Sequence, residues 1–274
     1  MREKSKKIFT VMLASFLAAT FFMSSLISVE ASDTLVTEEA KIDFLRSIGT
    51  TDEALSSYNP KQIDDLYNTL YGKNAVFSGY NTQIMDITES SSGEKGNIPT
   101  SQLQLTIGTY DLTSNGKVTG VDVSLGYKWL KEPVFNMTDA LTFKWDSNLF
   151  YDDGFYGFSN CLVDGQNLTL ESINAPALAD SGSFGWYSKL SLPHHGNSYQ
   201  HYGSAQTLLR PHTPFSTSAN LNSKMYLTYA HQILGPEISF GLSDVGVSFA
   251  GGSFDQLSSS YTCLLYTSPS PRDA

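Results

Sequence analysis

The chain has 274 residues, of which 16% are charged and 12% are aromatic, and its formal net charge is −10. This composition is too aromatic and too weakly charged for an intrinsically disordered protein. An acidic surface repels phosphate backbones and anionic lipid headgroups, so we expect no nucleic-acid partner, and the same repulsion disfavours membrane interaction.

The first 31 residues are typical of an export signal. Basic residues at positions 2, 4, 6 and 7 precede an uncharged, largely apolar stretch over 8–27, and Val29 and Ala31 are small residues at the positions that a signal peptidase reads. We predict cleavage after Ala31 and a mature protein that is secreted or held at the cell surface. An uncleaved anchor helix is the alternative, although scattered Ser and Thr residues disfavour it.

Residues 32–73 have the apolar spacing of helices. The first such segment ends at Gly49, residues 50–53 (TTDE) have the composition of a capping box that opens a short second helix, and Asn59-Pro60 opens a third. Short helices with one apolar face each cannot bury that face alone. We expect the three to pack on one another or on the sheet that follows.

Residues 74–262 are predicted to form a β-rich domain, because their hydrophobic period is two. Segments 103–107 and 121–129 alternate apolar and polar residues, which predicts half-buried antiparallel strands, and Asn115-Gly116 between them predicts a hairpin turn. Further predicted strands span 76–88, 141–145, 167–173, 184–190, 205–209, 224–230, 237–241, 245–249 and 258–261. The predicted fold is mainly β: an antiparallel β-sandwich or an elongated β-structure with a small helical N-terminal segment.

The C-terminal residues 263–273, CLLYTSPSPRD, resemble a translated sequencing adapter, and we predict that residues 263–274 are not native. A genuine Pro-rich tail is the alternative. Without Cys263, the sequence has one cysteine, Cys161, so it allows no internal disulfide, and a native C-terminus that differs from residues 263–274 is the alternative source of a partner.

All five histidines lie between residues 194 and 231. Imidazole is the commonest metal ligand, and the grouping suggests a zinc site centred on a predicted loop over 192–203. The candidate ligands are His194, His195, His201 and His212. The chain has no HExxH motif and no cysteine pair, which favours a polar surface loop over a metal-dependent extracellular hydrolase.

A second candidate metal site is acidic. Asp146, Asp152 and Asp153 follow the strand that ends at Trp145, and carboxylates in a loop are suitable ligands for Ca²⁺. Their spacing differs from that of an EF-hand, so a solvated turn is the alternative.

Three aromatic residues could form a binding platform. Tyr156, Trp186 and Tyr187 lie near acids and amides, and exposed rings in such surroundings stack on sugars, whereas most aromatic residues of a sandwich belong to its core. The same alternating strands are also found in insertion hairpins, which leaves a membrane-active β protein as another alternative.

No motif for nucleophilic catalysis is present. The chain lacks the Gly-x-Ser-x-Gly elbow, and Cys161 reads as a small buried thiol. We therefore expect a binding protein rather than an enzyme.

Several short runs carry a resemblance. FLRSIG at 44–49, KWLKEPVF at 128–135, TDA at 138–140 and WDS at 145–147 resemble a group of uncharacterised exported proteins of Gram-positive bacteria. The resemblance implies export and brings no catalytic residues. The sequence thus predicts an exported, non-enzymatic surface or binding protein, with a cell-envelope component or a carbohydrate as ligand and Ca²⁺ or Zn²⁺ as the only cofactors it suggests.

Overall fold

The computed structural model describes residues 36–87, 101–131, 139–164, 167–173, 178–180, 182–188, 199–217, 221–234, 239–243, 246–250 and 253–265. The chain divides into two units, Met1–Val36 and Thr37–Ala274, and the second holds all but one of the described residues. The predicted export signal lies outside them.

The three predicted helices are confirmed as α2 (Glu38–Ser47), α3 (Asp52–Ser57) and α4 (Pro60–Leu70). Each begins after a residue whose side chain accepts a hydrogen bond from the first turn: Thr37, Thr51 and Asn59. None of the helices in the described residues is both long and apolar enough to span a bilayer.

The predicted capping box at residues 50–53 was wrong by one residue. Thr51 caps α3, whereas the hydroxyl of Thr50 is buried and donates to the hydroxyl of Tyr110 at 3.2 Å. A complete box stands at α4 instead, where Asn59 and Gln62 each accept a hydrogen bond from the other's backbone N–H.

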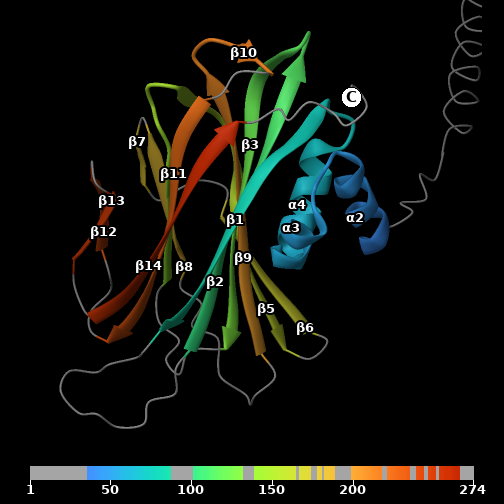
Figure 1. Ribbon diagram of the computed structural model, residues 1–274. Coiled ribbons are helices and arrows are strands. Elements are labelled where there is room, and N and C mark those ends of the chain that lie inside the picture. Colours follow the sequence, from blue (N-terminus) through green and yellow to red (C-terminus); the bar gives the residue numbers. More distant parts are fainter. Residues whose placement is uncertain are drawn as a thin grey trace, which may run out of the picture. The chain divides into compact units, whose positions relative to one another are not determined.

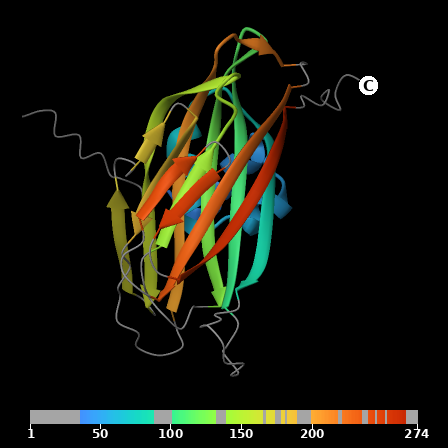
Figure 2. The ribbon, with the colours of Figure 1, turned by 90° about the vertical axis from the view of Figure 1, so that its left-hand side faces the viewer.

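In the described part of the chain, the β strands form two larger antiparallel sheets and one pair, which confirms the predicted fold class (Figures 1 and 2). Sheet A has seven strands, with β10 (Phe215–Ser216) paired to β3 and the others in the order β1 (Ala75–Ile87), β2 (Ser101–Ser114), β3 (Lys117–Lys131), β9 (Tyr199–Pro211), β5 (Phe150–Asp164) and β6 (Asn167–Ile173). Sheet B has the order β14 (Ser253–Leu265), β11 (Leu221–Leu234), β4 (Asp139–Lys144), β8 (Ser183–Ser188) and β7 (Leu178–Asp180). The pair is β12 (Ser239–Ser243) with β13 (Gly246–Ala250).

The hairpin between β2 and β3 turns at Asn115 and Gly116, as predicted. Both residues have a positive φ, 51° and 70°, which is the conformation that a two-residue hairpin turn requires. At the other end of the chain, β14 extends to Leu265 and pairs Cys263 with Ser223. The strand therefore includes the first three residues of the predicted adapter segment.

Two predicted loops are strands in the structure. Residues 150–154, expected in an acidic loop, begin β5, and residues 199–203, expected in a His-rich loop, begin β9. In β5 the register shifts between Asp152 and Gly154 and again between Phe155 and Gly157. Such bulges interrupt the period of two by which a strand is recognised in a sequence.

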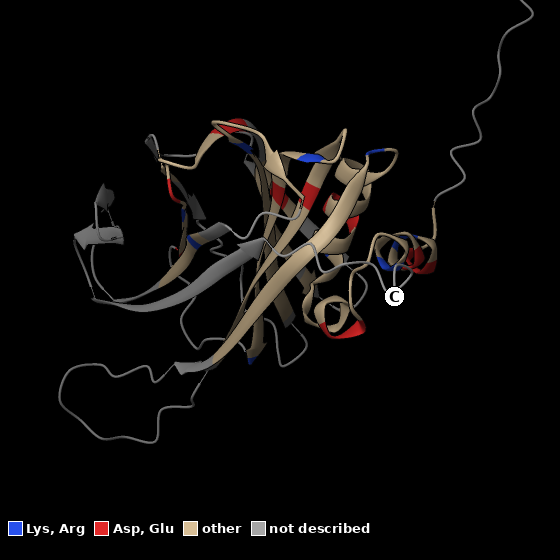
Figure 3. Ribbon diagram, turned by 45° about the horizontal axis from the view of Figure 1, so that its top comes forward, with Lys and Arg blue, Asp and Glu red and all other residues tan. Residues whose placement is uncertain are grey.

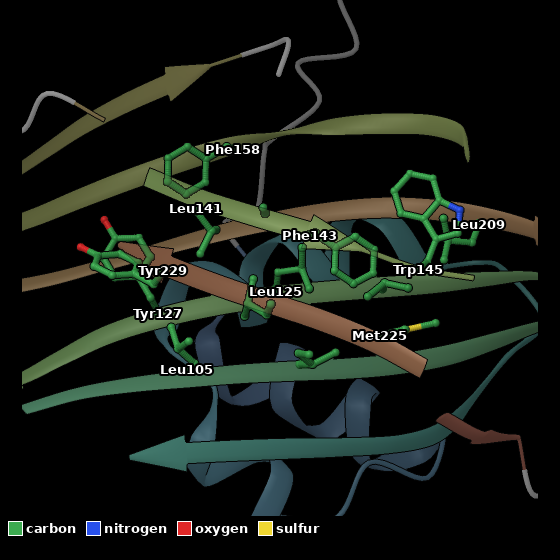
Figure 4. Close-up of a cluster of buried hydrophobic side chains, with 14 of the residues drawn as sticks. Leu105, Leu125, Tyr127, Leu141, Phe143, Trp145, Phe158, Leu209, Met225 and Tyr229 are labelled. Carbon is green, nitrogen blue, oxygen red and sulfur yellow. The ribbon is translucent and has the colours of Figure 1, made fainter. Parts of the chain in front are cut away.

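The main core lies between the two sheets (Figure 4). Alternate residues of β2 and β3, such as Leu105 and Leu125, face Phe143 of β4 and Met225 of β11, and none of the four has exposed surface. The rings of Phe143 and Trp145 stack at 5.7 Å between centroids. The face of sheet A toward sheet B thus carries the apolar residues of the alternating pattern that the sequence predicted.

The helices cover the opposite face of sheet A (Figure 1). Their apolar side chains form a second cluster with the beginning of β1 and with Tyr110 of β2: Leu45, Ala54, Leu55, Tyr58, Ile63, Leu66, Leu70 and Ala75. Every residue of 121–127 in β3 is consequently buried. The prediction of a half-buried strand was therefore wrong, because a helical layer replaces solvent on the polar face.

Candidate binding cleft

The histidines proposed as zinc ligands are spread over different environments. His194 and His195 lie outside the described residues, His201 is buried in β9, and His212 is exposed after β9, with Nε2 3.0 Å from the carbonyl oxygen of Ser147. Among the residues that the structure describes, no three His, Cys, Asp or Glu side chains are grouped so as to hold a metal ion.

The acidic residues proposed as calcium ligands have separate partners. Asp146 accepts a hydrogen bond from the backbone N–H of Asn148, Asp152 accepts one from the hydroxyl of Thr207, and Asp153 forms an ion pair with Arg210. The structure does not bring these three carboxylates together.

The proposed aromatic platform is divided between the sheets. The backbone places Tyr156 in β5 of sheet A, and Trp186 and Tyr187 in β8 of sheet B. Their side chains lie outside the described part of the structure.

A cleft of about 240 Å³ lies between α4 and the strands of sheet A that the helices leave uncovered. Its residues are Lys61, Asp65, Asn68 and Thr69 of α4, Gly157, Phe158 and Ser159 of β5, Ser172 of β6 and Gln206 of β9. Positions 61, 65, 68 and 69 share one helix face because they are separated by four, seven and eight residues. Gly157 stands at the second bulge of β5 with a φ of 108°, which favours glycine.

Polar groups with free hydrogen-bonding capacity converge on this cleft from three elements. The side chains of Asn68, Ser159 and Ser172 make no hydrogen bond to any residue in the described part of the chain. Lys61 and Asp65, one helical turn apart, form an ion pair and so neutralise each other. The cleft is thus lined by neutral groups that can both donate and accept hydrogen bonds.

A hydrogen-bond chain runs from the cleft into the layer between helices and sheet. The hydroxyl of Thr69 donates to Oε1 of Gln206 at 2.9 Å, and Nε2 of Gln206 donates to Oδ1 of Asp122 at 2.6 Å. Asp122 has no exposed surface, and its Oδ2 has no partner among the described residues. Burial raises the pKa of Asp122 to about 7, although the Gln206 hydrogen bond opposes the rise.

These residues were absent from the sequence prediction. Asp122 lies on the polar side of an alternating strand, and the polar face of α4 has the composition of a solvated surface, so neither pattern indicated a site. The amphipathicity of α4 is the signal that could have drawn attention to this helix. Because the apolar face of α4 packs on the sheet, the polar residues at the border of that face lie beside the sheet.

Cys161 is buried in β5 next to this region. Burial is the main cause that raises the pKa of its thiol to about 11. The side chain is therefore protonated at neutral pH and is not prepared for nucleophilic attack.

No family model matches the chain, and no curated protein matches it either. Among solved structures, the chain is similar to the collagen binding domain of the Erysipelothrix rhusiopathiae surface protein RspB, with 7% identity, a TM-score of 0.24, and coverage of 59% of this chain and 62% of that one. It is also similar to a chain from a study of pH-induced modulation of Streptococcus parasanguinis adhesion by Fap1 fimbriae, with 10% identity, a TM-score of 0.26, and coverage of 68% and 97%. The chain spans less than two thirds of the RspB domain, and TM-scores this low carry no inference about function.

Proposed function

We propose that the protein is an exported, non-enzymatic binding protein that holds a neutral, hydroxyl-rich ligand, a carbohydrate, in the cleft between α4 and sheet A. One observation carries the proposal. Side chains from α4, β5 and β6 bring hydrogen-bonding groups without partners in the described residues, Asn68, Ser159 and Ser172, to a single concave site. Asn68 and Ser172 are exposed and Ser159 is half-buried, so all three are accessible to water or to a ligand.

The chemistry of the cleft favours a neutral ligand. An anionic ligand would need an unpaired cation, and Lys61 is paired with Asp65. On the helical layer both charge signs occur together (Figure 3), and Lys41 pairs with Asp64 in the same way. Sugar hydroxyls donate and accept hydrogen bonds, as amides and serine hydroxyls do, so the two surfaces are complementary.

The size of the cleft limits what it can enclose. About 240 Å³ is below the roughly 300–1,000 Å³ of sites that enclose drug-sized molecules, so the cleft suits one sugar ring or the end of a longer glycan. Tyr156 directly precedes Gly157 of the cleft wall in the chain, which places one member of the predicted aromatic platform beside this site in sequence.

Export is supported by the basic and apolar pattern of residues 1–31. A protein that works outside the cell meets cell-envelope polysaccharides, which belong to the ligand class inferred from the cleft. The metal-dependent hydrolase and the membrane-active protein have no support from a described group of residues.

The test is binding of a panel of neutral methyl glycosides to the chain without its predicted export signal, measured by calorimetry and by ¹⁵N chemical-shift mapping. We expect shifts at Asn68, Ser159 and Ser172, and about tenfold weaker binding in the double variant Asn68→Ala, Ser159→Ala, because two neutral hydrogen bonds are lost. The matched control is Asn148→Ala with Ser114→Ala, two exposed positions outside the cleft. Binding that maps elsewhere, or no binding by any glycoside, would overturn the proposal.

A further inference from the structure

The chain of hydrogen bonds from Thr69 through Gln206 to Asp122 joins the wall of the cleft to a fully buried carboxylate. Thr69 and Gln206 line the cleft, and Asp122 lies behind them on β3. A chemical change at Asp122 can therefore reach the cleft through two hydrogen bonds.

Each hydrogen bond in the series from Thr69 to Asp122 has a donor and an acceptor. An ionised Asp122 offers only acceptors, so Gln206 must present its Nε2–H to the carboxylate. The Oε1 atom of Gln206 then faces Thr69, and the hydroxyl of Thr69 donates its single proton to that oxygen. In this state Thr69 offers only lone pairs to the cleft.

Protonation of Asp122 reverses the direction. A proton on Oδ2 would be a buried donor without an acceptor among the described residues, whereas a proton on the oxygen that faces Gln206 can be donated. A half-turn of the Gln206 amide places Oε1 against that O–H and Nε2 against the hydroxyl oxygen of Thr69. Thr69 then accepts from Gln206, and its own proton is free for the cleft. The only covalent change is at Asp122: its O–H bond forms as a hydronium ion of the solvent gives up its proton and becomes water.

We propose that Asp122 sets the hydrogen-bond polarity of the cleft through Gln206, so that Thr69 accepts a hydrogen bond from the ligand when Asp122 is ionised and donates one when it is protonated. The part that concerns the ligand rests on the proposed function. The reversal itself is a property of the protein alone.

The surroundings of Asp122 keep both states accessible near neutral pH. Asp65 of α4 adds negative charge, Lys73 after α4 adds positive charge, and Gln206 of β9 donates a hydrogen bond. Tyr110 of β2, which is paired with Asp122 across the strands, stays neutral because burial raises its pKa. Desolvation outweighs the two favourable partners, and the pKa of Asp122 rises to about 7.

The first experiment needs no ligand. The carboxyl ¹³C shift of Asp122, the side-chain amide signals of Gln206 and the ¹³Cβ shift of Thr69 are followed from about pH 5 to about pH 9, two units on each side of the expected midpoint. We expect one shared titration, absent from the neutral variant Asp122→Asn. If the Gln206 and Thr69 signals stay constant while Asp122 titrates, the reversal does not occur and the proposal is overturned.

The second experiment uses methyl glycosides of neutral hexoses and N-acetylhexosamines, with each parent compared with its O-methylated derivatives. A methylated hydroxyl can only accept, so the derivative that is methylated at the hydroxyl facing Thr69 should bind about three- to tenfold better at pH 5.5 than at pH 8.5, the effect of one neutral hydrogen bond. Asp122→Asn and Thr69→Val should both remove this preference.

The two experiments separate the two proposals. If glycosides bind with the same pH dependence in the wild type and in Asp122→Asn, the reversal fails while the binding function stands. If the three NMR signals titrate together but no glycoside binds, the reversal stands and the carbohydrate function fails.

Discussion

The central strands of sheet A are buried on both faces, but the two faces are held in different ways. On the face toward sheet B, side chains such as Leu105 and Leu125 pack against Phe143. On the face toward the helices, the buried side chains of Asp122, Ser124 and Gln206 are polar. Burial of apolar area is non-directional, whereas hydrogen bonds require particular partners at particular positions. The helical face is therefore the one where position and polarity are defined closely enough for a binding site.

Asn59, the capping residue of α4, shows how specific the contact between the helices and sheet A is. The side-chain nitrogen of Asn59 donates to the carbonyl oxygens of Tyr127, at 3.2 Å, and Gly203, at 2.8 Å, on the neighbouring strands β3 and β9. Its side-chain oxygen meanwhile caps α4 by accepting from the backbone N–H of Gln62. Asn59 therefore caps the N-terminus of α4 and also attaches that end of the helix to sheet A.

The largest effect is expected on the apolar face. Phe143→Ala removes a ring without exposed surface and should lower the free energy of unfolding by about 3–5 kcal/mol, through lost burial and the cavity left behind. Chemical denaturation at fixed pH measures the loss. The control is Tyr226→Ala on the neighbouring strand β11, because Tyr226 is 39% exposed. This substitution should lower the free energy of unfolding by less than about half of the Phe143→Ala loss. Equal losses would show that the core between the sheets is not the main source of stability.

The polar face should make stability depend on pH. The pKa of Asp122 is raised from 3.8 to about 7, so the folded state binds the proton more tightly than the unfolded state does. Its stabilising contribution is present below about pH 4 and is lost as the pH rises through about 7. The full loss is on the order of 4 kcal/mol, since each pKa unit corresponds to about 1.4 kcal/mol. Denaturation curves at a series of pH values measure it.

Asp122→Asn isolates this contribution. The variant is neutral at every pH, so it should match the wild type near pH 4 and exceed its stability above about pH 7. Burial also raises the pKa of Asp111, to about 6, and that residue is unchanged in both proteins, so its similar loss cancels in the difference. A constant difference between the two proteins across this range would contradict the assignment to Asp122.

The alternating pattern predicted the strands but not what covers them. In β3, Val121 and Val123 point to the sandwich core and Asp122 to the other side, as the period of two requires. Nothing in that period distinguishes a face covered by water from one covered by polar helix residues. The sequence therefore predicted the fold class, the hairpin and the three helices, and missed the buried polar layer.

The cleft was beyond prediction for the same reason. Asn68 and Thr69 occupy a polar helix face, which is ordinarily solvated, and Ser159 belongs to β5, a strand hidden by its bulges. Their convergence depends on which strands follow one another in sheet A, with β9 inserted between β3 and β5. That order is a property of the assembled sheet and not of any local pattern.

The contact between the two layers can be tested at Gly126 of β3. A Cβ atom there would lie 2.0 Å from Oε1 and 2.5 Å from Nε2 of Gln62, so the Gln62 side chain would have to move. It would lose its hydrogen bonds to the backbone N–H of Asn59 and to the hydroxyl of Ser124. Gly126→Ala should therefore cost about 1–2 kcal/mol, measured by denaturation.

The sign of this effect should depend on Gln62. In a Gln62→Ala background the clash is absent, and replacing a strand glycine with alanine ordinarily stabilises by about 0.5–1 kcal/mol because the unfolded chain has less freedom. Gly126→Ala should then become neutral or stabilising, which is a coupling between the two positions. Additive costs in the double variant would mean that Gln62 does not occupy the space above Gly126. The polar contact between helix and sheet would then be limited to residues such as Asn59 and Thr69, and Gln62 would contribute nothing specific to the helical face of sheet A.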